Sequence, residues 1–413
     1  MERGDLTSAR LVRLLLDRIE AVDDAGPTLN AVIEVNPEAI EIARDLDQER
    51  AAGKPRGPLH GIPVVLKANI DTGDRMATSA GSVALALHRA SDDAYHVAAL
   101  REAGVVILGK ANLSEWANFR STRSVSGWSS IGGQTRNPHV LDRSPCGSSS
   151  GSAVAVAAGL AVLAVGTETN GSIVCPAGAN GVVGIKPTVG LVSRDGIIPI
   201  ALSQDTAGPM ARSVRDAALL LAAMAAPDNA DPAAQAHPGP RDYLAALDDR
   251  ALEGARIGVW RQHHGAGSDP RVEAIFDAAV ARLAELGAEV VDPLGLEIDG
   301  GVRDAEYEVL LYEFRDGLNR YLGHAGLEDD RGSLAALIRF NELHADETMP
   351  WFGQEIFELA ETREALTDEA YLQARENSGP ALRRTVDSLM AEHELDAIIA
   401  PTNSPAWPLD FVA

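Results

Sequence analysis

Two short loops rich in serine and glycine carry the strongest chemical signal in this chain. Residues 144–152 read Ser-Pro-Cys-Gly-Ser-Ser-Ser-Gly-Ser, and residues 166–172 read Gly-Thr-Glu-Thr-Asn-Gly-Ser. The run between them has no charged side chain, and it predicts a buried helix that stops at Gly159, followed by a buried strand. A tight helix–strand hairpin would bring Ser148 close to Ser172. Hydroxyls and backbone N–H groups of both loops would then face one point.

Lysine is rare in this chain, and one lysine occupies a position that suits a proton acceptor. Lysine occurs only at positions 54, 67, 110 and 186, so arginine supplies the other 32 of the 36 basic residues. Arginine keeps its proton, whereas a buried lysine can lose it. Lys67 follows the apolar residues 62–66, which predict a buried strand, so it could act as a neutral base. It could equally be a charged lysine paired with Asp71, and the residues alone leave both interpretations open.

A second serine offers an alternative nucleophile. Residues 147–151 match G-x-S-x-G, the nucleophile elbow of α/β-hydrolases, with Ser149 at the centre. That elbow needs a buried strand directly before it, and residues 137–146 are polar and contain proline. An esterase of this kind would use Ser149 and a later histidine, whereas the two-loop interpretation uses Ser172 and Lys67 without a histidine. A third hypothesis is an inactive homologue, or a fragment, that only binds.

The elements that must position these loops alternate between helix and strand. The first predicted helix is capped by Thr7 or Ser8. Strands are predicted over residues 30–35, 62–66, 105–108, 161–165, 181–185, 256–260, 288–291 and 396–400. Helices are predicted over residues 36–51, 92–102, 112–119, 150–159, 213–224 and 270–286, and over nearly all of 302–393. This alternation predicts an α/β fold, with a large sheet between helical layers.

The overall composition indicates a globular protein and disfavours two classes of partner. The chain has 413 residues, of which 46% are hydrophobic, and a formal net charge of −24 at pH 7. So large a negative charge argues against binding to nucleic acid and to anionic membranes. The longest apolar run is too short to span a bilayer, and the polar first residues show no secretory signal. We therefore expect a cytoplasmic protein, either a monomer or a homodimer.

Cysteine and histidine usage predicts neither a disulfide framework nor a metal site. Only Cys146 and Cys175 occur, and we interpret both as reduced, buried, small apolar side chains. His263 and His264 are adjacent but lack further ligands at metal-binding spacing. The prediction is an enzyme that needs no metal and no cofactor.

The motifs together resemble the amidase signature family along the whole chain. The similarity is densest in six blocks, at residues 61–71, 108–116, 144–152, 166–173, 184–188 and 203–210. Within that family the chain looks most like the peptide amidases, through residues 144–152, 173–176 and 349–355. The resemblance implies a mixed sheet between helical layers, in a single domain over residues 1–413. It further implies a signature core over 61–225, a helical cover over 302–393 and a chain truncated at its C-terminus.

The same resemblance implies a mechanism and assigns the site residues. Ser172 would be the nucleophile, and Lys67 would be the neutral base. Ser148 would relay the proton of Ser172 to Lys67, and a cis Gly147–Ser148 peptide would hold Ser148 in place. The oxyanion hole would consist of the backbone N–H groups of Thr169, Asn170, Gly171 and Ser172. Cys146, Gly147 and Ser149 would bind substrate. The implied substrate is a primary carboxamide on a small molecule or a peptide, and peptide C-terminal amides belong to this class. The reaction would release ammonia.

Three residues of the nucleophile loop depart from the commoner family pattern. Glu168 and Asn170 stand where that pattern has Asp and Gly, and Val174 stands where it has Arg. The missing Arg argues against the amidotransferase subunit that acts within a tRNA-charging complex. Asn170 still suits an unusual backbone conformation better than most residues do.

Overall fold

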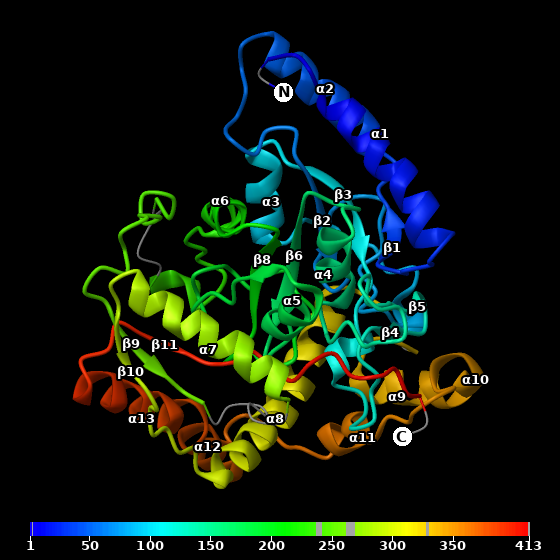
Figure 1. Cartoon of the computed structure of the whole chain (residues 1–413). Coiled ribbons are helices and arrows are strands. Elements are labelled where there is room, and N and C mark those ends of the chain that lie inside the picture. The colour runs from blue at the N-terminus through cyan, green and yellow to red at the C-terminus, as the bar shows by residue number, and fades with distance from the viewer. Residues whose placement is uncertain (2, 237–241, 262–268, 328–329, 412–413) are drawn as a thin grey trace. The chain divides into compact units, whose positions relative to one another are not determined.

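The computed structural model describes residues 1, 3–236, 242–261, 269–327 and 330–411 (Figure 1). Their contacts divide into two compact units, which we describe separately. The larger unit comprises Met1–Leu244, Phe314–Thr362 and Pro408–Ala413, and the smaller comprises Ala245–Glu313 and Arg363–Trp407. The single domain over residues 1–413, its core over 61–225 and its cover over 302–393 stay predictions.

The larger unit is built on a six-stranded mixed sheet, in the order β1-β3-β2-β6-β8-β7. β2 pairs in parallel with both β3 and β6, and the other three pairings are antiparallel. The strands are β1 (Val32–Val35), β2 (Pro63–Lys67), β3 (Val106–Ala111), β6 (Leu163–Glu168), β7 (Val183–Gly184) and β8 (Thr206–Ala211). The central strands β2, β3, β6 and β8 are buried along their whole length. Their sequences are therefore mostly apolar or small rather than alternating, and the buried charged residues Lys67, Lys110 and Glu168 stand out in them.

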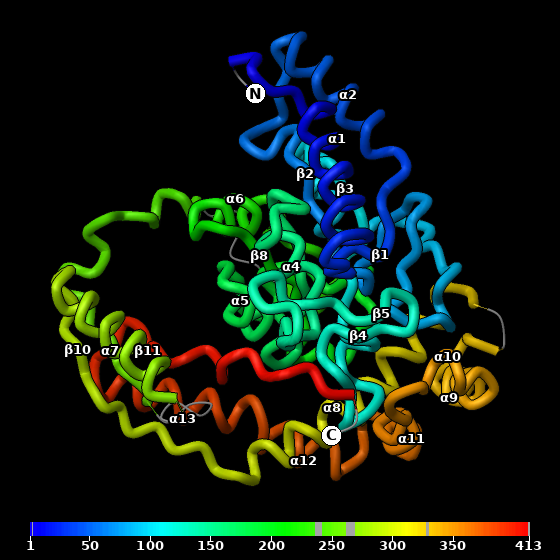
Figure 2. Tube along the Cα trace, turned by 45° about the vertical axis from the view of Figure 1, so that its right-hand side comes forward, coloured from blue at the N-terminus to red at the C-terminus, as the bar shows by residue number. Residues whose placement is uncertain are grey.

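Helices cover both faces of this sheet. Successive strand residues point to opposite sides, so the apolar residues of one strand contribute to a core on each face. Val65 of β2 packs in a core with α1 (Ser8–Arg18), α2 (Ala39–Ala51) and α4 (Ser150–Ala157). Val64 and Leu66 pack in a second core with α3 (Tyr95–Glu102) and α6 (Val214–Met224). α1 and α2 lie side by side in both views (Figures 1 and 2). The predicted α/β class, a mixed sheet between helical layers, is confirmed.

Aromatic side chains anchor the helical segment 314–362 within the larger unit. Phe314, from α8 (Gly300–His324), lies 5.0 Å from Phe119 between ring centroids, and Phe357 lies 5.5 Å from Trp116. Phe352 packs edge-on against Trp128 at 5.2 Å. Further elements of this unit include α5 (Val174–Asn180), the hairpin β4 (Trp128–Ser129) and β5 (Gly133–Gln134), α9 (Leu334–Leu343), α10 (Ala345–Thr348) and α11 (Glu355–Glu361).

The smaller unit contains a parallel three-stranded sheet, in the order β10-β9-β11. Its strands are β9 (Arg256–Val259), β10 (Glu289–Val291) and β11 (Ala397–Ile399), and its helices include α7 (Pro270–Glu285), α12 (Glu369–Asn377) and α13 (Gly379–Glu392). These elements match the strand–helix–strand unit and the last strand that the sequence predicts. In the described ranges, no helix is both long enough and apolar enough to cross a bilayer.

One prediction of secondary structure is wrong, and one strand of the central sheet was missed. The helix predicted over 112–119 is a short 3-10 turn over Glu115–Asn118, because Trp116, Ala117 and Asn118 all have positive φ, which a regular helix excludes. The strand β8 was not predicted, since Gly208 and Pro209 weaken any strand pattern. A Cβ on Gly208 would lie 2.1 Å from the Ile185 carbonyl oxygen, so this close strand packing requires glycine.

Candidate active site

The ends of two adjacent parallel strands bring the candidate base to the first serine loop. Lys67 ends β2 and Glu168 ends β6, and Leu66 is paired with Val165. The Lys67 side chain has no exposed surface. Its Nζ donates to Ser148 Oγ at 2.7 Å, to Thr167 Oγ1 at 2.8 Å and to the Thr167 carbonyl oxygen at 3.1 Å.

Burial shifts Lys67 toward the neutral form. Loss of hydration lowers the pKa of Lys67 to about 7, and the negative charges of Asp205 and Glu168 oppose that shift. The alternative partner, Asp71, instead accepts a hydrogen bond from Tyr321 Oη at 2.7 Å. Lys67 therefore contacts uncharged oxygens. In its neutral form the amine has two N–H groups for Thr167 and one lone pair that can accept from the Ser148 hydroxyl.

The two serine loops lie in contact, as the hairpin argument predicts. The Gly147–Ser148 peptide is cis, which confirms that expectation. The backbone N–H of Ser149 donates to the Ser172 carbonyl oxygen at 3.1 Å, and Ser114 N–H donates to the Ser148 carbonyl oxygen at 3.0 Å. Ser172 retains 7% exposure, and its Oγ makes no hydrogen bond to any described residue. The nucleophile candidate thus has an unengaged hydroxyl one loop away from Ser148.

The loop proposed for the oxyanion hole turns sharply between β6 and α5. Gly171 has φ of +82°, a conformation that favours glycine. Its N–H donates to Glu168 Oε1 at 2.9 Å, so one of the four proposed donors already has an acceptor. Thr169 Oγ1 donates to the buried Asp205 carboxylate, which also accepts the N–H groups of Ile200 and Ala201. The N–H groups of Thr169, Asn170 and Ser172 remain the other candidates.

The alternative nucleophile Ser149 does not have the surroundings of an elbow. Its side chain is fully buried, and its Oγ donates to the Thr167 carbonyl oxygen at 3.0 Å and accepts from Thr167 N–H at 3.2 Å. Residues 138–146 form no strand before it. These contacts disfavour attack by Ser149. Any role of this serine in substrate binding would have to come from the main chain.

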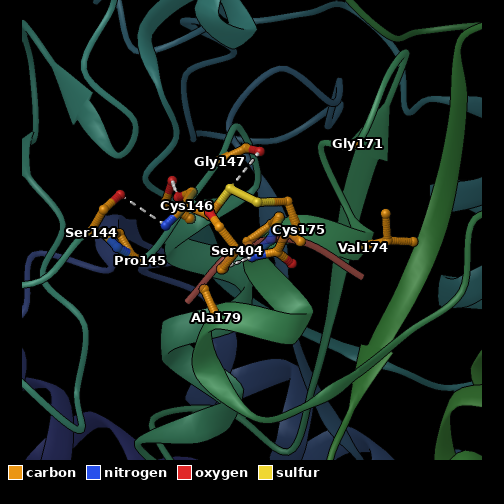
Figure 3. The surroundings of a disulfide bond; sticks show 12 residues. Ser144, Pro145, Cys146, Gly147, Gly171, Val174, Cys175, Ala179 and Ser404 are labelled. Carbon is orange, nitrogen blue, oxygen red and sulfur yellow. Dashed lines mark hydrogen bonds between the residues drawn. A yellow bond between two sulfur atoms is a disulfide. The ribbon is translucent and has the colours of Figure 1, made fainter. Parts of the chain in front are cut away.

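The interpretation of the two cysteines as reduced thiols is wrong. Cys146 and Cys175 form a disulfide, with their Cα atoms 5.9 Å apart (Figure 3). Cys146 precedes the Gly147–Ser148 peptide, and Cys175 lies in the first turn of α5. The fold that brings the serine loops together therefore also brings the thiols together, which a separation of 29 residues does not reveal. The cytoplasmic location, which rested in part on free thiols, stays a prediction.

The described residues around these loops form no metal-binding cluster. Among the described residues, no group of three histidine, cysteine or carboxylate side chains is placed to hold a metal ion. His263 and His264, whose spacing the sequence analysis weighed, lie outside the described residues.

A serine loop bonded to a buried lysine is the arrangement that a serine–lysine hydrolase requires. The family model described as Amidase matches residues 10–410, so the chain belongs to the amidase family, a class of hydrolases that act on amide carbon–nitrogen bonds. The native peptide amidase from Stenotrophomonas maltophilia superposes with a TM-score of 0.95 and 52% identity, over 99% of this chain and 83% of that one.

Two further relatives agree with this assignment. A peptide amidase solved in complex with the competitive inhibitor chymostatin has a TM-score of 0.96 and 51% identity, over 100% of this chain and 84% of that one. A probable amidase of Arabidopsis thaliana is 42% identical over 404 residues, which is 95% of this chain and 76% of the relative. The suspected likeness to peptide amidases is confirmed.

Three features of the site escaped the sequence analysis. Thr167 supplies two of the three acceptors of Lys67, and Asp205 adds a buried carboxylate. Glu168 was noted only as a departure from the commoner pattern. Thr167 and Asp205 both lie in blocks that carry the family resemblance, so those blocks were the available signal. The contact of Thr167 with Lys67 depends on the pairing of β2 with β6, and the place of Asp205 depends on the pairing of β6 with β8, which the sequence did not reveal.

Proposed function

We propose that the protein hydrolyses primary carboxamides, including peptide C-terminal amides, through an acyl-enzyme on Ser172. The observation that carries this proposal is the fully buried Lys67, with a pKa lowered to about 7 and its Nζ 2.7 Å from Ser148 Oγ. The similarity to solved peptide amidases at 51 and 52% identity supports the substrate class.

In this mechanism Ser148 carries protons between Ser172 and Lys67. Ser172 Oγ attacks the amide carbon while its proton passes through Ser148 Oγ to Lys67 Nζ. Backbone N–H groups of the loop 169–172 stabilise the negative oxygen of the tetrahedral intermediate. The carbon–nitrogen bond then breaks, the proton returns from Lys67 through Ser148 to the leaving nitrogen, and ammonia departs. Water attacks the resulting ester by the same proton route, which regenerates Ser172.

Labelling with a fluorophosphonate, followed by mass-spectrometric mapping, tests the nucleophile. We expect the label on Ser172, and we expect Ser172→Ala to abolish both labelling and ammonia release from a peptide amide. Ser149→Ala is the matched control, because it removes a neighbouring buried hydroxyl, and labelling at Ser172 should persist. A label on Ser149 would favour the esterase, and a folded wild-type protein without label or ammonia release would favour the inactive homologue.

A further inference from the structure

We infer that Glu168 is the positioning residue for the nucleophile, and that its carboxylate fixes the backbone on both sides of Ser172. This inference rests on the proposed function of Ser172. Glu168 ends the buried strand β6, four residues before Ser172, and only 5% of its surface is exposed. The chain must turn from this strand end into α5, which begins at Val174.

The carboxylate of Glu168 accepts three backbone N–H groups of that turn. Oε1 accepts from Gly171 at 2.9 Å, and Oε2 accepts from Ile173 at 2.6 Å and from Val174 at 3.0 Å. Gly171 and Ile173 are the residues on either side of Ser172, and the carbonyl of Ser172 accepts from Ser149 N–H. Hydrogen bonds to an ionised acceptor are about twice as strong as neutral ones. One side chain thus holds the peptide units before and after the attacking hydroxyl.

The contacts of Glu168 also indicate which backbone N–H groups position the turn and which ones are left to bind the oxyanion. Because the Gly171 N–H already points at the carboxylate, it serves the geometry of the turn. Stabilisation of the oxyanion then falls to the other N–H groups of the loop 169–172. A side chain that accepts three N–H groups has no equivalent among uncharged residues, since an amide in its place would turn one NH₂ toward a backbone donor.

Glu168 has a second, electrostatic effect on the base. The charges that face Lys67 are those of Asp205, before β8, and of Glu168, on β6, and both raise the pKa of Lys67 against the effect of burial. Glu168 also acts on Lys186: burial lowers the pKa of Lys186, and the Glu168 charge opposes that shift. Removal of the Glu168 charge should therefore lower the pKa of Lys67 and move the acid limb of the rate profile to lower pH. Asp205 would still raise the pKa of Lys67 in such a variant.

Glu168→Gln tests the inference with two readouts. The expected result is a fall in kcat of about 10²-fold, the loss typical of a misplacement near 1 Å, with a KM that changes less than about threefold because the lost contacts fix Ser172 and not the substrate. The acid limb should move to lower pH. Glu168→Asp keeps the charge on a side chain one methylene shorter, so the acid limb should stay in place and kcat should recover at least about tenfold relative to Glu168→Gln.

Asp23→Asn is the matched control, because it also removes a buried carboxylate that accepts hydrogen bonds from backbone N–H groups. Asp23 is fully buried and accepts Ala31 N–H at 2.8 Å and Val32 N–H at 2.9 Å. Asp23→Asn should lower the melting temperature but leave kcat and the acid limb of the rate profile unchanged. The inference is overturned if Glu168→Gln keeps wild-type kcat, if Asp23→Asn slows turnover equally, or if a folded Glu168→Asp displaces the acid limb.

Fluorophosphonate labelling separates this inference from the proposed function. If wild-type Ser172 takes no label, the proposed function fails and the inference falls with it. If wild-type Ser172 is labelled and Glu168→Gln is labelled at the same rate, only the inference fails. The expected result is labelling of Ser172 in both proteins, with the variant slower by about 10²-fold.

Discussion

Replacement of Lys67 by arginine separates the role of a proton acceptor from that of a positive charge. Lys67 is fully buried and makes three hydrogen bonds within 3.1 Å. Arginine could replace some of these bonds and the charge, but its guanidinium does not lose its proton at neutral pH. If Lys67 accepts the proton from Ser148, Lys67→Arg should lower kcat by about 10² to 10⁴-fold, the range for loss of a positioned general base.

The magnitude of the pH effect follows from the lowered pKa of Lys67. The neutral form is the active one, so the rate should fall as the pH drops below about 7. Each further pH unit reduces the neutral fraction about tenfold, so at pH 5 about one molecule in a hundred keeps an active base. The assay is ammonia release from a peptide amide at saturating substrate between pH 5 and 9. Wild type should show this acid limb.

Lys110→Arg is the control for arginine at a buried lysine. Lys110 is also fully buried, ends in contacts with the Ile70 carbonyl oxygen and Thr78 Oγ1, and has a pKa lowered by burial to about 8. This variant should lose stability yet keep the acid limb and most of kcat. The reasoning is refuted if Lys67→Arg turns over at a near wild-type rate, or if Lys110→Arg loses as much kcat as Lys67→Arg.

Two further predictions concern stability. The folded protein should contain no free thiol until it is reduced, and free thiols titrated in the native, unreduced protein would contradict the disulfide. Cys175→Ser should lower the free energy of unfolding in urea by about 3.6 kcal/mol, as expected from the entropy of closing a loop with a sequence separation of 29. Glu115→Gln should lower it by about 3–5 kcal/mol, because Glu115 is the buried ion-pair partner of the fully buried Arg120. A change below about 1 kcal/mol in the same urea titration would show that Arg120 finds enough compensation elsewhere.

Local pattern in the sequence was enough to locate most elements and the three residues of the proposed triad. A capping residue predicted the start of α1, helices were predicted at the positions of α6 and α7, and apolar runs predicted β2 and β6, because helix and strand patterns are set by neighbours along the chain. The small-residue loops and the scarcity of lysine drew attention to Ser148, Ser172 and Lys67. The family resemblance then supplied their roles.

Contacts between distant segments decided what the sequence could not. The strand β8 exists because Thr206 and Gly208 pair with Glu168 and Gly166, although its own sequence contains glycine and proline. The disulfide forms because two loops 29 residues apart fold onto each other. Burial beside Thr167 lowers the pKa of Lys67 and supports the proposed base over the ion-pair partner, since hydration and neighbouring charges set a pKa and both are properties of the packed protein.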